Sequence, residues 1–254
     1  MAIPRFYCPN LTEHTEFLLL DDEATHATKS LRMKEGDLLI AFDGQGWQAT
    51  ARVRSIRRKE VCCLASDRKF LPGELPGEVT LAIALPKGDR QRLIVERLVE
   101  LGIHRMIPLH TARSVAEGTD GALARLRRYS IEACKQSGRN RNLEIAEGVN
   151  LQSYLQSHIG REANGKSIQW VAHPYPFESQ TKEEALSPPE RASSLSMIVG
   201  PEGGLTDSEV LEAIEAGWQC LNLGPRILRV ETAVSYLAAL ANYWLEPPKI
   251  LSQG

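Results

Sequence analysis

The sequence predicts an α/β protein in which a parallel sheet follows a smaller, mostly β domain. Two observations predict this. From residue 79 to residue 244, short apolar runs alternate with segments of helical periodicity, which is typical of a parallel sheet covered by helices on both faces. Residues 1–70 instead contain short strand-like segments separated by turn residues, which favours a small β-barrel.

Composition fits a folded protein without a membrane span. Of 254 residues, 43% are hydrophobic, and apolar runs are all too short to cross a bilayer. Five cysteines, an odd number without metal-binding spacing, disfavour disulfides and zinc and fit a reducing cytosol, so we expect a cytoplasmic protein without a bound metal. Pro4 and Arg5 stand where an apolar segment would begin, so we expect no signal peptide.

In the first region we expect a short helix and three strands. The helix covers residues 26–31, and the strands cover residues 37–42, 47–56 and 61–65, with a turn at residues 43–46. The second strand alternates, which predicts one face with Trp47, Ala49, Ala51 and Val53.

A boundary follows, because two Pro-Gly pairs within residues 71–78 cannot continue a strand or a helix. We therefore predict a first domain of residues 1–72, a linker of residues 73–78 and a second domain of residues 79–254.

The second region has regular elements with clear boundaries. Asp89 is a candidate N-cap and Gly102 a stop for one helix, whose Leu93, Ile94, Leu98 and Leu101 fall on one side. Two further helices are a basic one near residues 122–136 and an apolar one at residues 233–244, which we expect to pack on a second subunit. The predicted strands are residues 79–85, 103–109, 167–172, 195–199 and 221–223.

Two strand–turn–helix stretches share one design. Val199 ends an apolar run before the turn at residues 200–204, and Thr206 with Glu209 has the spacing of a capping box. A second apolar run ends at Gly224-Pro225 before another helix. Ligands bind beyond the carboxyl ends of strands in open α/β sheets, and glycine lets them approach the backbone, so we predict one pocket lined by both loops. Taken alone, the first loop also fits an ordinary βα turn.

Together these stretches resemble the SPOUT class of RNA methyltransferases and, within it, the RsmE family. The resemblance extends over most of the chain. Its other segments are residues 2–7, 26–33, 36–37, 42–44, 87–89, 100–102 and 132–139. The sequence departs from the family pattern at Arg97 and Lys135, which stand in place of a lysine and an acid, and it lacks the proline usual after Arg141.

The resemblance implies a specific activity and architecture. Members use S-adenosyl-L-methionine to methylate N3 of a uridine in 16S ribosomal RNA of the small ribosomal subunit, a step of ribosome biogenesis. Their first domain is a PUA-like RNA-binding barrel, and their second is a SPOUT domain with a C-terminal trefoil knot. They are homodimers in which the partner chain completes each active site.

The resemblance also implies the site residues. The cofactor-binding residues are His173, Pro174, Val199, Gly200, Pro201, Glu202, Gly203, Gly204, Leu223, Gly224, Ile227, Leu228, Arg229, Thr232 and Ala233.

For catalysis we predict Arg229, Arg139 and Glu231. Uridine N3 must lose its proton, and arginine donors aimed at the O2 and O4 oxygens would stabilise the resulting charge, as an oxyanion hole does. Glu231 is placed to orient an arginine or to accept the proton. Arg139 and Glu231 have structural alternatives, since Arg139 also fits a helix C-terminus and Glu231 a helix N-terminus.

For RNA binding we predict basic residues in both regions. They are Arg5, Arg32, Arg52, Arg54, Arg57, Arg58, Lys87 and Arg139. Net charge is only −2, but basic residues cluster at residues 52–59 and 125–141, where they form either a phosphate footprint or a solvated face.

Two alternatives stay open. One is a SPOUT relative that methylates another target, such as a ribose hydroxyl of transfer RNA. The other is an RNA-binding module that has lost catalysis, which the intact glycine loops disfavour.

Overall fold

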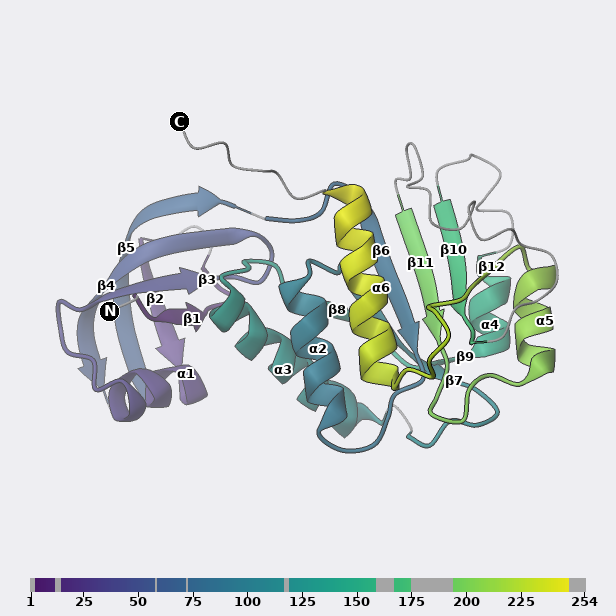
Figure 1. Cartoon of the computed structure of the whole chain (residues 1–254). Coiled ribbons are helices and arrows are strands. Elements are labelled where there is room, and N and C mark those ends of the chain that lie inside the picture. Colours follow the sequence, from purple (N-terminus) through teal and green to yellow (C-terminus); the bar gives the residue numbers. More distant parts are fainter. Residues whose placement is uncertain are drawn as a thin grey trace. The chain divides into compact units, whose positions relative to one another are not determined.

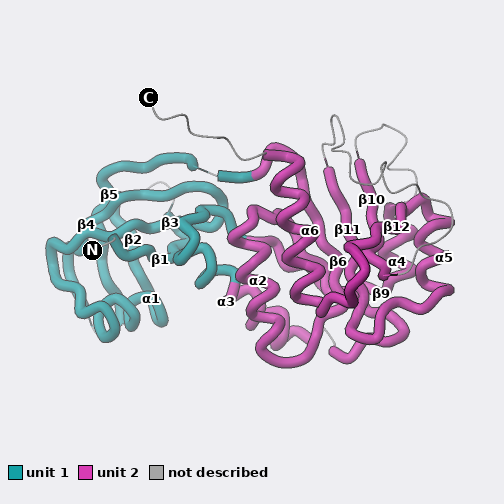
Figure 2. Tube along the Cα trace, viewed as in Figure 1, with its two compact units in different colours: residues 1–74, 130–142 teal, residues 75–129, 143–254 magenta. Residues whose placement is uncertain are grey.

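The computed structural model describes residues 3–11, 15–57, 59–71, 73–116, 119–158, 167–174 and 194–246 (Figure 1). Arg58 lies outside these residues. The chain divides into two compact units (Figure 2), one of Met1–Glu74 with Ser130–Asn142 and one of Leu75–Tyr129 with Leu143–Gly254. The sequence places residues 130–142 in the second domain, whereas their contacts place them in the first unit. The predicted domain boundaries stay a prediction.

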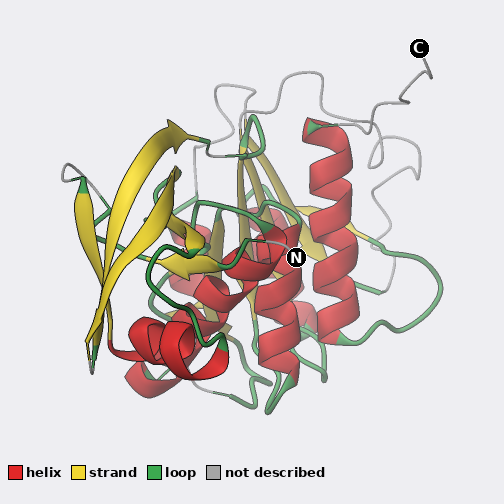
Figure 3. Cartoon of the chain, turned by 90° about the vertical axis from the view of Figure 1, so that its left-hand side faces the viewer, coloured by secondary structure: helices red, strands yellow, loops and turns green. Residues whose placement is uncertain are grey.

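The first unit contains a five-stranded sheet that curls strongly (Figure 3). Its strands are β1 (Arg5–Tyr7), β2 (Glu16–Leu20), β3 (Leu38–Phe42), β4 (Trp47–Arg57) and β5 (Glu60–Phe70), in the order β1-β3-β4-β5-β2. Register shifts between β4 and β5 at Thr50/Ala51 and Val53/Ser55 bend this pair, as β-bulges do. The expected barrel is a curled half-barrel in the described residues, because β1 and β2 form its two edges.

One side of this sheet carries the core of the first unit. Ala49, Ala51 and Val53 are buried there, as their alternation predicts. The prediction that Trp47 shares this buried face is wrong, because its side chain is 45% exposed and packs on Phe70, with ring centroids 5.3 Å apart. The expected helix at residues 26–31 begins earlier, as α1 (Asp21–Thr25) followed by a π-helix, η1 (His26–Ser30).

The second unit contains a parallel sheet in the order β12-β10-β11-β6-β7-β8, with β9 paired to β7. The strands are β6 (Glu78–Ile83), β7 (Arg105–His110), β8 (Glu144–Ile145), β9 (Val149–Asn150), β10 (Ser167–Ala172), β11 (Ser194–Val199) and β12 (Gln219–Leu221). Their register aligns the carboxyl ends of four strands, because Leu221 pairs with Ala172, Ala172 with Val199, and Val199 with Ile83. The loops that follow these strands therefore leave the sheet at one edge.

Helices cover both faces of this sheet (Figure 1). On one face α2 (Arg90–Glu100) packs against α6 (Val230–Leu245), and α6 contacts β11 and β6. On the other face α4 (Leu151–Gln156) and α5 (Asp207–Glu215) form a core with Ala82 and Ile198. The remaining helix, α3 (Asp120–Ser137), begins in the second unit and ends in the first. No helix of the described residues is long and apolar enough to cross a membrane.

The buried face of α2 differs from the predicted one at two positions. Leu93 is 37% exposed, whereas Gln91 is buried and its side-chain amide donates a hydrogen bond of 2.7 Å to the Pro86 carbonyl. Gly102 ends the helix as expected, with φ of +75°, and the Ile103 N–H donates back to the Leu98 carbonyl at 2.9 Å.

Candidate functional site

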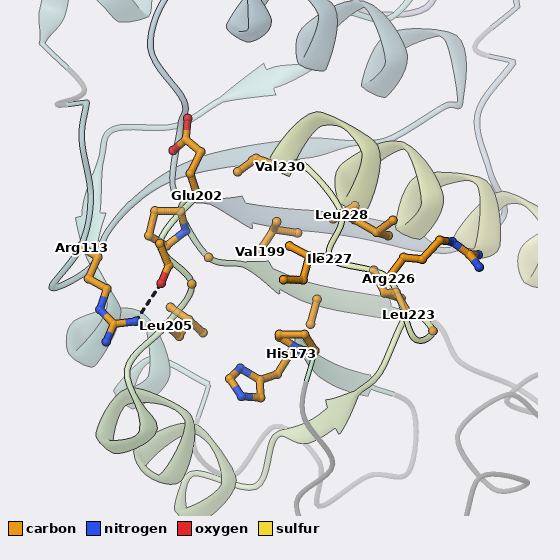
Figure 4. Close-up of a pocket in the computed structure, with 18 of the residues that line it drawn as sticks. Arg113, His173, Val199, Glu202, Leu205, Leu223, Arg226, Ile227, Leu228 and Val230 are labelled. Carbon is orange, nitrogen blue, oxygen red and sulfur yellow. Dashed lines mark hydrogen bonds between the residues drawn. The ribbon is translucent and has the colours of Figure 1, made fainter.

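The loops that follow β10, β11 and β12 line one cavity of about 290 Å³ at the carboxyl edge of the parallel sheet (Figure 4). β10 lies between β11 and β12, so the two predicted loops follow strands that are not neighbours, and the β10 loop completes the wall between them. The structure brings thirteen of the predicted cofactor-binding residues to this cavity: His173, Pro174, Val199, Gly200, Pro201, Glu202, Gly203, Gly204, Leu223, Gly224, Ile227, Leu228 and Ala233.

The first loop, residues 200–206, folds tightly for local reasons. A Cβ on Gly200 would lie 2.9 Å from Leu205 Cγ and 3.1 Å from its backbone nitrogen, so this position has no room for a side chain. Gly204 has φ of +70°, and its N–H donates a 2.8 Å hydrogen bond to the Pro201 carbonyl. The capping box is confirmed, since the Glu209 N–H donates to Thr206 Oγ1 and the Thr206 N–H donates to Glu209 Oε2.

A segment from another part of the chain holds this loop. Arg113, which follows β7, donates from Nη1 to the Gly203 carbonyl at 2.7 Å (Figure 4). The Ala112 N–H donates to Glu209 Oε1, also at 2.7 Å. A Cβ on Gly203 would lie 3.4 Å from Arg113 Cδ, which is ordinary van der Waals contact, so the two residues pack directly against each other.

The second loop, residues 222–229, connects β12 to α6. Gly224 has φ of +110°, and its N–H donates to Asn222 Oδ1 at 2.7 Å. Asn222 Nδ2 donates to the Pro174 carbonyl at 2.8 Å, which ties this loop to the β10 loop. Ile227 is 83% exposed at the cavity, an unusual position for a large apolar side chain that a ligand would cover.

Two predicted cofactor residues do not line the cavity. Arg229 is the N-cap of α6; its carbonyl accepts from the Thr232 and Ala233 N–H groups, and its side chain is exposed. Thr232 is also exposed, because it lies one position from Ala233 on the helix and faces solvent. The cavity instead includes six residues that we did not predict: Arg113, Ala172, Leu205, Asp207, Arg226 and Val230. Four of them adjoin predicted residues, and Asp207 lies three residues after Gly204, whereas nothing in the sequence links Arg113 to this site.

Charge at the cavity is mixed. The charged residues that line the cavity are two acids, Glu202 and Asp207, and two bases, Arg113 and Arg226. Figure 4 shows the Arg226 side chain pointing outward. Burial lowers the pKa of His173, although the nearby Asp207 carboxylate opposes this. His173 is therefore neutral at pH 7. Among the described residues, no three His, Cys, Asp or Glu side chains are placed to hold a metal ion.

The other two catalytic candidates, Glu231 and Arg139, are not among the residues that line the cavity. Glu231 is 8% exposed in the first turn of α6, and its Oε2 lies 4.0 Å from Arg90 Nη1. Arg139 belongs to the first unit, where Nε and Nη2 donate to the two carboxylate oxygens of Glu74 at 2.8 and 2.5 Å, and both side chains are buried. This pairing favours a structural role for Arg139, and the catalytic roles stay predictions.

Several predicted RNA-binding residues have partners inside the protein. Arg5 Nη2 donates to Asn140 Oδ1 at 2.6 Å, and its guanidinium lies over the Phe42 ring. Arg52 donates to the Gly36 carbonyl, Arg54 pairs with Glu16, and Arg57 pairs with Glu60. Arg32 and Lys87 are exposed, and Arg58 lies outside the described residues.

Three of the six basic residues at 125–141 pair with acids within the described part of the chain. Arg127 pairs with Glu147, Lys135 with Glu23 and Glu132, and Arg139 with Glu74. Lys135, one of the departures from the family pattern, thus neutralises a largely buried carboxylate on α1. The structure favours internal ion pairs over a phosphate footprint for these residues.

Comparisons with known proteins agree with this fold and pocket. A family described as "RNA methyltransferase domain" matches residues 73–242, and one described as "RNA methyltransferase PUA domain" matches residues 19–65. Ribosomal RNA small subunit methyltransferase E of Bacillus subtilis is 32% identical over 247 residues, covering 93% of each chain. Its namesake from Mycobacterium tuberculosis is 30% identical over 240 residues, covering 92% of this chain and 89% of the relative.

A solved structure of ribosomal RNA small subunit methyltransferase E from Neisseria gonorrhoeae, bound to S-adenosyl methionine, superposes with a TM-score of 0.80. It is 30% identical and covers 95% of this chain and 97% of that chain. The fold and these matches define an RNA methyltransferase. Within that class, the chain belongs to the ribosomal RNA small subunit methyltransferase E family, which confirms the resemblance to RsmE.

Proposed function

We propose that this enzyme transfers a methyl group from S-adenosyl-L-methionine to N3 of a uridine in 16S ribosomal RNA. One observation carries the proposal: the two glycine-proline loops, at residues 200–206 and 222–229, line a single cavity at the carboxyl edge of the sheet. The N. gonorrhoeae relative, named for its action on small-subunit ribosomal RNA, holds S-adenosyl methionine.

The cavity fits this cofactor. Apolar side chains such as Val199, Leu223 and Leu228 suit the faces of an adenine ring. A Cβ built on Gly204 or Gly224 meets nothing within 4 Å, so both loops expose backbone to a ligand. The proposed cofactor contacts are therefore mainly backbone groups of residues 200–204 and 223–228, with Ala233 closing one wall.

When bound, S-adenosyl-L-methionine supplies an electrophilic methyl group on its sulfonium. The protein's task is to place the acceptor nitrogen in line and to stabilise charge on the uracil. Arg229 suits the second task, because it is exposed directly after the loop that lines the cavity, and no side-chain hydrogen bond or ion pair occupies it within the described part of the chain.

We further propose that the enzyme works in the cytoplasm as a homodimer with a trefoil knot. Tyr236 and Tyr243 on α6 are 46% and 56% exposed, which supports a subunit contact there. The segment after β12, an edge strand among the described residues, returns to α6 on β11 and β6, and a chain that crosses back in this way is compatible with a knot. We retain a PUA-like RNA-binding domain at residues 1–72 and a SPOUT domain at residues 79–254 as functional divisions.

Mass mapping of 16S ribosomal RNA from cells that lack this protein tests the proposal. We expect one 3-methyluridine to disappear and to return when purified enzyme and S-adenosyl-L-methionine are added to small subunits from those cells. An unchanged set of modified nucleosides would refute it. Parallel reactions on naked RNA would distinguish the assembled subunit from free RNA as substrate.

A further inference from the structure

Arg90 lies beside the cavity without lining it, and it faces two carboxylates. Its Nη2 is 2.8 Å from Glu202 Oε1, and its Nη1 is 4.0 Å from Glu231 Oε2. Glu202 lies in the loop after β11, and Glu231 lies in the first turn of α6, directly after the loop that follows β12. One guanidinium thus contacts the elements that carry both cavity loops.

The backbone around Arg90 is firmly placed. Arg90 is the first residue of α2, and the next residue, Gln91, donates from its N–H to the Gly88 carbonyl at 3.2 Å. The buried Gln91 side chain also donates to the Pro86 carbonyl. Arg90 therefore extends from a third element, the start of α2, toward the loop after β11 and the N-terminus of α6.

The carboxylate of Glu231 depends on this arginine. Its side chain is 10% exposed, and its buried Oε2 accepts no hydrogen bond within the described residues. Arg90 is also the one cation within 4.0 Å of either Glu202 or Glu231 among those residues. A buried carboxylate is costly without a charge partner, and the α6 N-terminus offsets only part of that cost.

We propose that Arg90 is a positioning residue, which fixes the separation of the two cofactor loops by pairing with Glu202 and Glu231. This assigns Glu231 the role of orienting Arg90, instead of accepting the uridine proton. The inference rests on the proposed function, because it takes the cavity as the cofactor site. Arginine suits the role because its fork of donors serves two carboxylates at once, whereas a lysine ammonium is a point charge.

Calorimetry with S-adenosylhomocysteine tests the assignment. Arg90→Ala should weaken binding roughly 5- to 30-fold, the factor for losing one or two partly exposed ion pairs. Arg90→Lys should recover part of the loss. Arg97→Ala is the matched control, because Arg97 lies on the same helix and, among the described residues, pairs only with the exposed Glu100, so this variant should bind as the parent does.

The double variant Arg90→Ala/Glu231→Gln separates the two roles of Glu231. If Glu231 acts through Arg90, the double variant binds S-adenosylhomocysteine no more weakly than Arg90→Ala. KM for S-adenosyl-L-methionine should rise in Arg90→Ala while kcat changes by less than about threefold. Thermal unfolding without ligand checks folding; if Arg90→Ala unfolds, Glu202→Gln and Arg90→Lys carry the same test.

Two results would overturn the inference. One is a folded Arg90→Ala protein that binds S-adenosylhomocysteine as the parent does. The other is a Glu231→Gln variant with unchanged affinity and abolished turnover, which would make Glu231 the proton acceptor. A parent protein that does not bind S-adenosylhomocysteine at all would instead refute the proposed function, and the role of Arg90 with it.

Discussion

Filling the cavity from one wall should separate ligand binding from folding. Ala233 is 8% exposed on the first turns of α6 and lines the cavity. The cavity of about 290 Å³ has little spare room for a nucleoside, since small-molecule sites span about 300–1,000 Å³. In Ala233→Leu the larger side chain occupies space that the ligand needs, so the overpacking arises only when the ligand binds, and by analogy with overpacked cores it costs about 1–3 kcal/mol of binding free energy. We therefore expect S-adenosylhomocysteine to bind roughly 5- to 150-fold more weakly.

Calorimetry measures this loss, and urea denaturation without ligand measures folding. Stability should change little, because the new side chain extends into a cavity that already exists instead of into packed core. Ala124→Leu is the matched control, because it makes the same change at an exposed position of α3 that does not line the cavity. A folded Ala233→Leu protein with parental affinity would show that the ligand does not use this wall.

Four other perturbations test separate steps. Arg229→Ala should lower the single-turnover methylation rate by roughly 10²–10³ with little change in cofactor affinity, and Arg229→Lys should not restore it fully; a normal rate would remove Arg229 from catalysis. Thr206→Ala should destabilise the protein by about 1 kcal/mol in urea denaturation, because it breaks the capping box of α5, and unchanged stability would contradict that role. Burial lowers the pKa of His173, so the unfolded chain binds a proton there more readily than the folded protein does. The free energy of unfolding should therefore fall as pH drops through the ordinary pKa of about 6.5. His173→Asn should show a shallower fall, and identical pH profiles for variant and parent would contradict this role of His173. Alanine at Arg52, Arg54, Arg57 and Arg58 should weaken RNA binding and flatten its salt dependence without affecting cofactor binding, and an unchanged salt slope would return these residues to a solvated face.

The parallel sheet could be predicted because its strands are nearly continuous apolar runs. β10 has the predicted bounds, and β11 begins one residue earlier than expected. The elements that were not predicted are β1, β2, β8, β9 and α4, which are short and depend on their partners. β1, for example, has three residues and becomes a strand by pairing in parallel with β3, a contact that no local pattern specifies.

The cavity could be predicted in part, for a similar reason. Gly200 and Gly224 mark turns whose chemistry is local, so the sequence reports them directly. Arg113 and Arg90 act through residues far along the chain, Gly203 and Glu202, and only the folded structure brings these together. The sequence does not predict that Thr232 faces solvent. The direction of a helical side chain depends on where the helix begins, and α6 begins at Val230, earlier than the predicted residue 233.

The two basic clusters, residues 52–59 and 125–141, are equally good RNA-binding candidates by sequence. The ion pairs that their arginines make in the structure distinguish them. Arg139 and Glu74 have side chains that are 5% and 8% exposed, and breaking such a buried pair costs about 3–5 kcal/mol. Arg57 and Glu60 are 77% and 34% exposed, and pairs of this kind contribute only about 0–1 kcal/mol. A phosphate can therefore replace Glu60 as the partner of Arg57 at little cost, whereas it cannot compete for Arg139. The arginines of β4 are consequently the better candidates for RNA binding, and the basic end of α3 is better explained by internal neutralisation.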